Sequence, residues 1–374
     1  MPTLSLARLS PSSLASSIAA VAIGSILLSA ASAQAQWTVS YLRPAGYSDS
    51  YARATTGTQQ AGYASVNIYT RHAGIWSGSA ASWVDLNPAG ASNSSVSATT
   101  GTQQAGGATI NNVSQAGIWS GTGGSWVSLH PAGVRSSYAS ATMGTQQAGS
   151  ASFVNLVRAC IWSGTAASWV DLHPAGAYQS YAAATTGTQQ AGTVEILDDG
   201  GTGRASLWSG SAASWVDLHP SGAVDSGALA IAGSQQVGFA ALDYFNGVQA
   251  SLWSGTAASW VNLNPVGAIE SMAKATTGMH QAGEAIIGGV QRAGIWSGTA
   301  SSWEDLSSAM TGSWGSSSAT SIWSDATTIY VAGYGLNNAT GRDEALLWTR
   351  PIPTPGAASV LAVGGLMAAK RRRR

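Results

Sequence analysis

A phrase with two tryptophans seven residues apart recurs along this 374-residue chain, and the first tryptophan advances by 43 to 46 residues between copies. A second phrase, ATTGTQQAG in its cleanest form, precedes each pair, and Trp-Val-Asp-Leu followed by His or Asn and Pro-Ala-Gly ends each unit. A fixed period of this length indicates an array of one small structural unit. The pairs are Trp76 and Trp83, Trp119 and Trp126, Trp162 and Trp169, Trp208 and Trp215, Trp253 and Trp260, and Trp296 and Trp303.

Each unit predicts four short β-strands. Gly and Pro interrupt the unit too often for ordinary helices and leave runs of about five residues between turns. We expect Trp162 and Trp169 to face each other across a hairpin with residues 164–167 as its loop. Such cross-strand pairs stabilise a hairpin by roughly 0.2–1 kcal/mol. The tryptophans are therefore mainly core residues, and a ligand-stacking role for some of them stays open.

The two ends of the array predict a closed ring. Residues 344–349 repeat the phrase of the first tryptophan a seventh time, but no fourth strand follows before the C-terminal segment. Residues 37–46, WTVSYLRPAG, match the end of a unit and therefore supply the missing strand. We predict an all-β fold over residues 36–350, a seven-bladed β-propeller closed by the N-terminal strand. An open β-solenoid is the alternative.

Charge is scarce and unevenly distributed. Only 9% of the residues are charged, and all 16 acidic residues lie between Asp49 and Glu344. Ten of the 16 basic residues lie in the repeat array, so that the array has a balance of −6. An acidic body has no electrostatic reason to bind nucleic acid, and we expect no nucleic-acid partner.

The N-terminus, residues 1–35, has the pattern of a secretory signal peptide. Arg8 precedes an apolar stretch at residues 18–28, and small residues follow. This order predicts export with cleavage after Ala33 or Ala35. The alternative is an uncleaved membrane anchor, although the apolar stretch is short for a spanning helix.

The C-terminus, residues 351–374, combines a proline-rich lead, about a dozen small apolar residues and a basic end. The layout resembles the PEP-CTERM sorting signal of exosortase-containing bacteria, with Thr354 between Pro353 and Pro355 where that family has Glu. The resemblance implies an exosortase-like partner, transient membrane contact and a place on the cell surface or in the extracellular matrix of a Gram-negative-type bacterium. The alternative is an uncleaved tail anchor. The basic end consists of Lys370, Arg371, Arg372, Arg373 and Arg374.

The repeat units also resemble the bacterial extracellular HAF-type repeats. The first unit reads Arg-His-Ala-Gly-Ile-Trp at residues 71–76, whereas other units replace the His by Arg, Gln or Glu. The resemblance covers residues 37–350 and implies a surface repeat protein. It implies no catalytic residue.

The residues that usually carry chemistry recur at equivalent positions, which predicts structural roles. His130, His173 and His219 stand where other units have Asn87, Asn264 or Ser307, and a turn beside Pro explains them. Asp85, Asp171, Asp217 and Asp305 are also equivalent, and each can accept hydrogen bonds in a turn. His72 and His280 lack Cys or carboxylates at ligand spacing. We therefore predict no catalytic, cofactor-binding or metal-binding residue and no cofactor.

Two further features are local. Cys160 replaces the Gly of other units, and a lone Cys in an exported chain forms no intramolecular disulfide. The acidic stretch at residues 195–203 lengthens one unit, and we expect a solvated loop there, with a calcium site as the alternative.

Three function classes follow from these observations. The first is an exported, surface-displayed or matrix-associated protein that is not an enzyme and acts as an interaction scaffold. The second is a lectin-like propeller with one weak sugar site on each of several blades. The third is a polysaccharide-degrading enzyme. The partner would be a surface or matrix polysaccharide or another surface protein.

Overall fold

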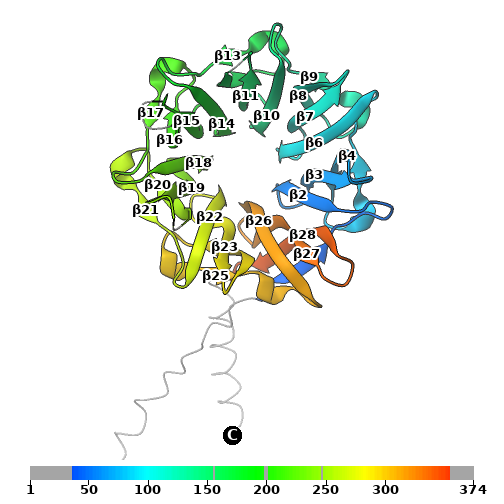
Figure 1. Ribbon diagram of the computed structural model, residues 1–374. Coiled ribbons are helices and arrows are strands. Elements are labelled where there is room, and N and C mark those ends of the chain that lie inside the picture. Colours follow the sequence, from blue (N-terminus) through cyan, green and yellow to red (C-terminus); the bar gives the residue numbers. More distant parts are fainter. Residues whose placement is uncertain (1–35, 155, 198–200, 246, 354–374) are drawn as a thin grey trace, which may run out of the picture. The chain divides into compact units, whose positions relative to one another are not determined.

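The computed structural model describes residues 36–154, 156–197, 201–245 and 247–353. These residues form seven four-stranded antiparallel sheets arranged as blades around a central axis (Figure 1). This confirms the seven-bladed β-propeller, and the open solenoid is wrong because the first and last strands of the array share one sheet. In the part of the chain described, no helix is long and apolar enough to cross a membrane.

Six blades contain four consecutive strands, listed from the axis outward. Blade 1 has β2 (Ser50–Thr55), β3 (Gln60–Ser65), β4 (Arg71–Trp76) and β5 (Val84–Asp85); blade 2 has β6 (Ala91–Thr99), β7 (Gln104–Ile110), β8 (Val113–Trp119) and β9 (Val127–Ser128); blade 3 has β10 (Ser136–Thr142), β11 (Gln147–Ser152), β12 (Val157–Trp162) and β13 (Val170–Asp171). Blade 4 has β14 (Gln179–Thr185), β15 (Gln190–Glu195), β16 (Gly203–Trp208) and β17 (Val216–Asp217); blade 5 has β18 (Asp225–Ala232), β19 (Gln235–Ala241), β20 (Gln249–Trp253) and β21 (Val261–Asn262); blade 6 has β22 (Ala268–Thr276), β23 (Gln281–Ile287), β24 (Val290–Trp296) and β25 (Glu304–Asp305).

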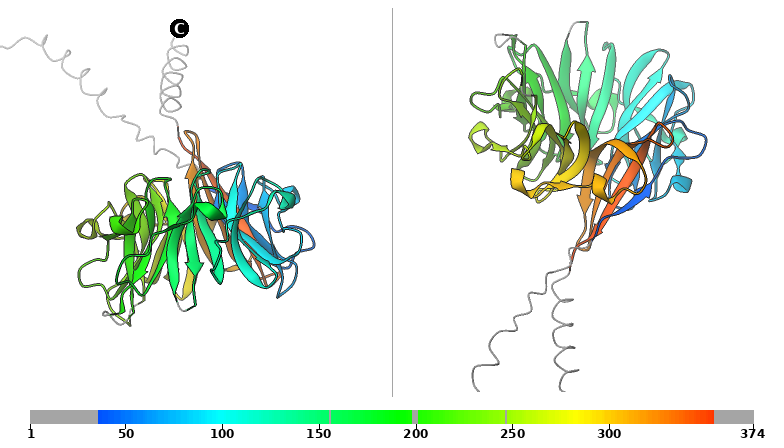
Figure 2. Two further views of the ribbon diagram at one scale, coloured as in Figure 1. Left: turned by 90° about the horizontal axis from the view of Figure 1, so that it is seen from above. Right: turned by 60° about the horizontal axis from the view of Figure 1, so that its bottom comes forward.

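Blade 7 is completed by both ends of the propeller. It contains β26 (Trp314–Ser324), β27 (Thr328–Asn337) and β28 (Arg342–Pro351), and its outermost strand is β1 (Thr38–Tyr41). Thr38 pairs with Thr349, so that β1 and β28 lie side by side (Figure 2). Trp37 extends the closure because its indole N–H donates to Glu304 in blade 6 at 2.7 Å. The predicted closure by the N-terminal strand is confirmed.

The tryptophan pairs pack as cross-strand neighbours. The first tryptophan of every pair is fully buried. In blades 1, 2 and 6 the ring centroids of the two tryptophans are 4.5–4.6 Å apart, as for Trp76 and Trp83. The connection between them is a short 3-10 turn rather than a plain hairpin loop. These turns are η1 (Ala80–Ser82), η2 (Gly123–Ser125), η3 (Ala166–Ser168), η5 (Ala212–Ser214), η6 (Ala257–Ser259) and η7 (Ala300–Ser302), with a further turn, η8 (Ser307–Ala309), after β25.

One small residue decides how the second tryptophan of a pair lies. In blade 1 a Cβ on Gly74 would stand 2.1 Å from the Trp83 ring, so that only Gly lets this ring cover the strand. Blade 4 has Ser206 at the equivalent position, and its Oγ accepts a hydrogen bond from Trp215 Nε1 at 2.9 Å. Two side-chain atoms, the Cβ and Oγ of Ser, therefore separate two packing modes, one of ring against backbone and one with a hydrogen bond.

The glycine of the Gln-Gln-Ala-Gly phrase is required by close backbone contact. A Cβ on Gly149 would lie 2.0 Å from the carbonyl oxygen of Tyr138 on the neighbouring strand. The same contact, at 1.9–2.0 Å, recurs in all seven blades. It lies beside a β-bulge of the innermost strand, where the register shifts by one residue, in blade 3 between Ala139 and Ala141. Bulges bring backbones together in a way that excludes side chains.

The two glutamines of the same phrase tie the blades and turns together. Gln59 Oε1 accepts hydrogen bonds from Thr99 Oγ1 (2.6 Å) and Gln104 Nε2 (3.0 Å) of the next blade. The next glutamine, Gln60, is fully buried, and its Oε1 accepts from Gly78 N at 2.9 Å. Buried amides need such partners. Gln103, Gln146 and Gln235 repeat the contact between blades.

Candidate functional site

The recurring histidines hold a buried serine in place. His173 Nδ1 lies 2.8 Å from Ser180 Oγ, and its Nε2 lies 3.2 Å from the carbonyl oxygen of Ala177. The carbonyl can only accept, which assigns the proton to Nε2 and makes Nδ1 an acceptor. Burial lowers the pKa of His173, and of the equivalent His130, which agrees with neutral rings.

Asparagine reproduces this pattern in other blades, which explains the exchange of His for Asn. Asn87 Oδ1 accepts from Ser94 Oγ at 2.6 Å, and Asn87 Nδ2 donates to the carbonyl oxygen of Ala91 at 3.2 Å. An Asn amide thus presents one acceptor and one donor in the same places as a neutral His. The histidines are therefore turn residues in the described structure.

The serine of these Ser–His pairs is a link between blades. Ser180 is fully buried, and its Oγ accepts from the backbone N–H of Ala159 in the preceding blade at 2.9 Å. A nucleophilic serine needs an exposed hydroxyl and a base that is free to take its proton. The Ser180–His173 pair meets only the second condition, because His173 Nδ1 can accept the proton but the Ser180 hydroxyl is fully buried.

The recurring aspartates close the same turn. Asp171 Oδ1 accepts from the backbone N–H of His173 at 2.8 Å, and Asp171 Oδ2 pairs with Arg158 at 2.8 Å. Equivalent ion pairs join Arg204 to Asp217 and Arg292 to Asp305, and in blade 1 His72 pairs with Asp85.

Several sequence predictions concern residues that offer no site in this structure. In residues 36–353, apart from those left undescribed, no group of three or more His, Cys, Asp or Glu could hold a metal ion. Cys160 is buried, and this burial raises the pKa of its thiol. Residues 198–200 of the acidic stretch, expected to be a solvated loop with a calcium site as the alternative, lie outside the described residues, as do Ala33, Ala35, Thr354, Pro355 and the basic end. Pro353 is described and exposed.

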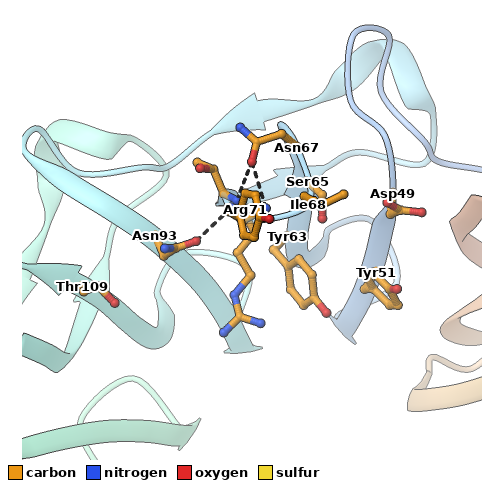
Figure 3. A pocket seen from close by; sticks show the side chains of 11 residues that line it. Asp49, Tyr51, Tyr63, Ser65, Asn67, Ile68, Arg71, Asn93 and Thr109 are labelled. Atoms are coloured by element: carbon orange, nitrogen blue, oxygen red, sulfur yellow. Dashed lines mark hydrogen bonds between the residues drawn. The ribbon is translucent and has the colours of Figure 1, made fainter. Parts of the chain in front are cut away.

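A pocket of about 570 Å³ lies at blade 1. Figure 3 shows Arg71 beside Tyr63 in the middle of this pocket, with Tyr51 and Asp49 on one side and Asn93 on the other. The lining residues come from β2, β3, β4 and the neighbouring blade 2. They are Asp49, Tyr51, Tyr63, Ser65, Asn67, Ile68, Tyr69, Thr70, Arg71, Asn93 and Thr109.

An aromatic and cationic stack forms the floor of this blade-1 pocket. The guanidinium of Arg71 lies 5.0 Å from the centre of the Tyr63 ring, within the range of a cation–π contact. Tyr63 in turn stacks on Tyr51, with ring centroids 4.8 Å apart. The six residues equivalent to Tyr63 are Gly107, Ser150, Thr193, Phe239, Glu284 and Tyr334.

Arg71 is the side chain of this stack that can contact a ligand. Its backbone N–H donates to Asn93 Oδ1 at 3.0 Å, and its side chain is exposed without an ion pair to any described carboxylate. None of the other blades has a basic residue at this position. The equivalent residues are Ser114, Val157, Gly203, Val248, Gln291 and Asp343.

The rim of the pocket is a displayed turn. Asn67 Oδ1 accepts from the backbone N–H groups of Tyr69 (2.9 Å) and Thr70 (3.0 Å), which fixes the loop between β3 and β4. Ile68 and Tyr69 at its tip are 80% and 83% exposed. Neighbouring large apolar side chains held out in this way mark a contact surface, and the equivalent loop of blade 5 presents Tyr244 and Phe245 similarly.

Tyr51 connects the pocket to the closing blade. Its hydroxyl donates to Asp343 Oδ2 at 2.6 Å, and burial followed by this hydrogen bond raises the pKa of Tyr51. Asp343 also donates its backbone N–H to Asp49 Oδ1 at 3.2 Å. The acidic side of the pocket is therefore fixed by blade 7, while the basic side, Arg71, belongs to blade 1.

Comparison with known proteins identifies the fold but assigns the chain to no family. No protein-family model matches the chain, and no curated protein does either. A prolyl endopeptidase structure matches with TM-score 0.52 and 11% identity over 83% of this chain and 51% of its own. Pyrococcus horikoshii acylaminoacyl peptidase matches with TM-score 0.51 and 11% identity over 84% and 53%. The chain thus spans about half the length of both.

A third structure is a propeller alone. The β-propeller domain of the Trilobed protease from Pyrococcus furiosus matches with TM-score 0.50 and 9% identity, over 82% of this chain and 98% of that domain. That domain is described as having an open velcro topology, whereas β1 closes the ring here. At these identities the likeness supports the fold alone.

The comparisons correct our sequence-based expectation of function. We expected an exported interaction scaffold without catalytic activity, then a lectin-like propeller, then a polysaccharide-degrading enzyme. That order of functions is wrong, because the similar structures include propellers of peptidases. The likeness does not bear on the expected absence of catalytic activity. The expectation rested on symmetry between blades, whereas the pocket depends on residues found in one blade.

Proposed function

We propose that this propeller recognises peptides, and that a carboxylate of the bound peptide pairs with Arg71 in the blade-1 pocket. The observation that carries the proposal is the exposed guanidinium of Arg71, which lies over Tyr63 in a 570 Å³ pocket and lacks a described carboxylate partner. Arginine presents a planar set of donors that matches a carboxylate in two parallel hydrogen bonds. The likeness to peptidase propellers supports peptide as the ligand class.

The rest of the pocket suits a peptide chain. Tyr69, which is 83% exposed, offers a ring face for a side chain at little entropic cost. The amide oxygens of Asn67 and Asn93 are engaged by backbone N–H groups. Their amide nitrogens are therefore available to donate to peptide carbonyls. The opposite charges of Asp49 and Arg71 favour one direction of the bound chain.

Recognition in this proposal occurs without hydrolysis by the propeller. The Ser–His pairs of the described residues are buried links between blades, as shown for Ser180 and His173. Mass spectrometry of peptides incubated with the protein tests this part, and we expect the peptides to stay intact. Time-dependent cleavage that survives repurification would contradict it.

The binding experiment uses tetrapeptide to hexapeptide pools made both as free acids and as C-terminal amides. Acidic side chains are left out of the pools, so that the chain end is the only carboxylate. We expect equilibrium dialysis with the full chain to enrich acids over amides by at least tenfold. Arg71→Gln should abolish this preference, because it removes the charge and the paired donors. Equal retention of acids and amides by the unmodified protein would overturn the proposal.

Arg135→Gln is the matched control. Arg135 is another exposed arginine without an ion pair to a described carboxylate, but it lies in blade 3 and donates only to the carbonyl oxygen of Val154. We expect this variant to keep the preference for free acids. Loss of the preference in both variants would indicate a general charge effect and would contradict a site at Arg71.

For the ends of the chain we propose export, with cleavage after Ala33 or Ala35 and tail processing by an exosortase-like enzyme. The support is the order of basic, apolar and small residues at the N-terminus and the Pro-Thr-Pro, apolar, basic order at the C-terminus. Expression in a bacterium that encodes an exosortase, followed by intact mass measurement, tests both steps. A product in the cytoplasm with both ends intact would contradict them.

A further inference from the structure

Each innermost strand places one unpaired residue at its β-bulge. The register shifts in blade 1 between Ala52 and Ala54 and in blade 6 between Ala273 and Ala275, which leaves Arg53 and Lys274 outside the ladder. All seven blades have this shift. The residues that it singles out are Arg53, Ser97, Ser140, Ala183, Leu229, Lys274 and Thr320.

These bulge residues line the centre of the ring. A cavity of about 240 Å³ is lined by Arg53, Ser97, Leu229, Lys274, Thr320 and Tyr334. The lining residues come from blades 1, 2, 5, 6 and 7. Because blades so far apart around the ring share one cavity, it lies on the central axis, among the innermost strands of Figure 1.

The charge of this axial cavity is one-sided. Its only charged lining residues are Arg53 and Lys274, and both are basic. They belong to blades 1 and 6, which flank the closing blade 7. Leu229 of blade 5 forms an apolar part of the wall. Lys274 is paired with Glu284, so that Arg53 carries the unpaired positive charge that attracts a compact anion.

The donors left free in the axial cavity can be counted. Lys274 Nζ contacts Glu284 Oε2 at 2.8 Å and Ser318 Oγ at 3.1 Å, which leaves one of its three N–H groups. Arg53 lies over the Tyr63 ring at 5.6 Å and pairs with no described carboxylate. Thr320 is unavailable, because its hydroxyl donates to the carbonyl oxygen of Ala52 at 2.6 Å.

We propose that the axial cavity binds a compact oxyanion of the phosphate class between Arg53 and Lys274. A tetrahedral oxyanion offers acceptors in several directions, which suits donors that converge from two blades. The bound ion would bridge blades 1 and 6 across blade 7, the blade that joins the two ends of the propeller. Its site differs from the peptide pocket, which depends on Arg71, although the Tyr63 ring lies beside both arginines.

Inorganic phosphate is the probe, and thermal unfolding of the full chain is the first readout. A ligand that binds only the folded state raises Tm in a saturable way, by about 5 °C at 100 times its Kd for a domain of this size. We expect that rise with phosphate but not with sodium chloride of equal ionic strength. Equal effects of the two salts would overturn the proposal.

Arg53→Gln tests the site directly. We expect isothermal titration calorimetry to show phosphate binding weakened at least tenfold, while Arg135→Gln binds as the unmodified protein does. Arg53→Lys keeps the charge, and its phosphate affinity should lie between that of Arg53→Gln and that of the unmodified protein. Circular dichroism checks that each variant is folded. Unchanged phosphate affinity in folded Arg53→Gln would refute the site.

Two further experiments distinguish the phosphate site from the peptide pocket and identify the source of the oxyanion. Arg71→Gln should bind phosphate normally, and Arg53→Gln should still prefer peptide acids. Loss of phosphate binding in Arg71→Gln would place the anion in the blade-1 pocket and contradict the axial site. If phosphoserine displaces phosphate and serine does not, the axial cavity binds phosphomonoesters. If neither displaces phosphate, the ligand of the axial cavity is the free ion.

Discussion

His173 Nδ1 lies 2.8 Å from Ser180 Oγ, and the same hydroxyl oxygen lies 2.9 Å from the backbone nitrogen of Ala159 in the preceding blade. One neutral imidazole therefore controls a hydrogen bond between two blades. If the ring gained a proton at Nδ1, its acceptor would become a donor that faces the serine hydroxyl. The junction between blades is thus sensitive to the protonation of the histidine.

Stability should fall as the medium becomes acidic. Burial lowers the pKa of His130 and His173, so that the unfolded chain binds their protons more readily than the folded one. The resulting stabilisation is complete above the ordinary histidine pKa of about 6.5 and is lost as pH falls through the lowered folded values. Urea unfolding at pH 8, 6.5 and 5 measures this as a decreasing midpoint.

The double variant His130→Asn, His173→Asn is the control for this pH effect. Asn supplies the same acceptor and donor without titrating, as Asn87 does in blade 1. Its urea midpoint should therefore fall less between pH 8 and pH 5. Identical pH profiles for variant and unmodified protein would show that the acid sensitivity has another origin.

Gly149→Ala should destabilise the fold by about 3 kcal/mol, the upper end for overpacking. The added Cβ would lie 2.0 Å from the carbonyl oxygen of Tyr138, and backbone cannot rotate away as a side chain can. Gly124→Ala is the comparison, because no atom lies within 4 Å of its Cβ position. It should change the free energy of unfolding by at most about 0.5 kcal/mol. Similar losses in both would contradict the contact.

Cys160→Ser should stabilise the protein by about 1 kcal/mol, the usual net value of one hydrogen bond. The buried indole N–H of Trp169 has only the thiol of Cys160, a weak acceptor, beside it, whereas the equivalent Trp215 donates to Ser206 Oγ. Serine at position 160 would supply that acceptor. Ser206→Ala removes the equivalent acceptor of Trp215 in blade 4 and should lower the free energy of unfolding by a similar amount. A loss of stability in Cys160→Ser, measured by urea unfolding, would show that the hydroxyl is not reached.

Trp37→Phe should cost about 2 kcal/mol, because it removes an indole hydrogen bond to the charged Glu304. The ring also lies against Arg350, whose guanidinium is 4.5 Å from its centroid, and Arg350 pairs with Glu304 at 2.6 Å. Trp323→Phe, at a tryptophan that is 36% exposed, should be nearly neutral. Equal effects in the two variants would mean that Trp37 adds nothing specific to closure.

The number of blades and their closure could be predicted because both depend on repetition. The match of residues 37–46 to the end of a unit fixed which strand completes blade 7. The Trp pairing was also predictable from the short loop. The difference between the Gly74 and Ser206 packing modes was not, because it depends on ring orientation around two side-chain atoms.

The blade-1 pocket could not be predicted from the repeats, because symmetry draws attention to residues that recur. Arg71 matters because no other blade has a basic residue at its position, and Tyr63 has aromatic counterparts only in Phe239 and Tyr334. The sequence signal was a tyrosine and an arginine at positions that mostly hold small or neutral residues elsewhere. The contact between Tyr63 and Arg71 also depends on the register of β3 and β4. The β-bulge that leaves Arg53 unpaired cannot be recognised in a single sequence.

The pairing of Thr38 with Thr349 also determines when the ring can close during folding. The first strand to be synthesised has no partner until the last one exists, because β1 is held by β28 alone. Six blades contain only neighbouring strands and can form while the chain is still growing, whereas ring closure requires a contact across almost the whole sequence. The growing protein is therefore an open arc in which β1 is unpaired, and the ring can close only after β28 has been synthesised.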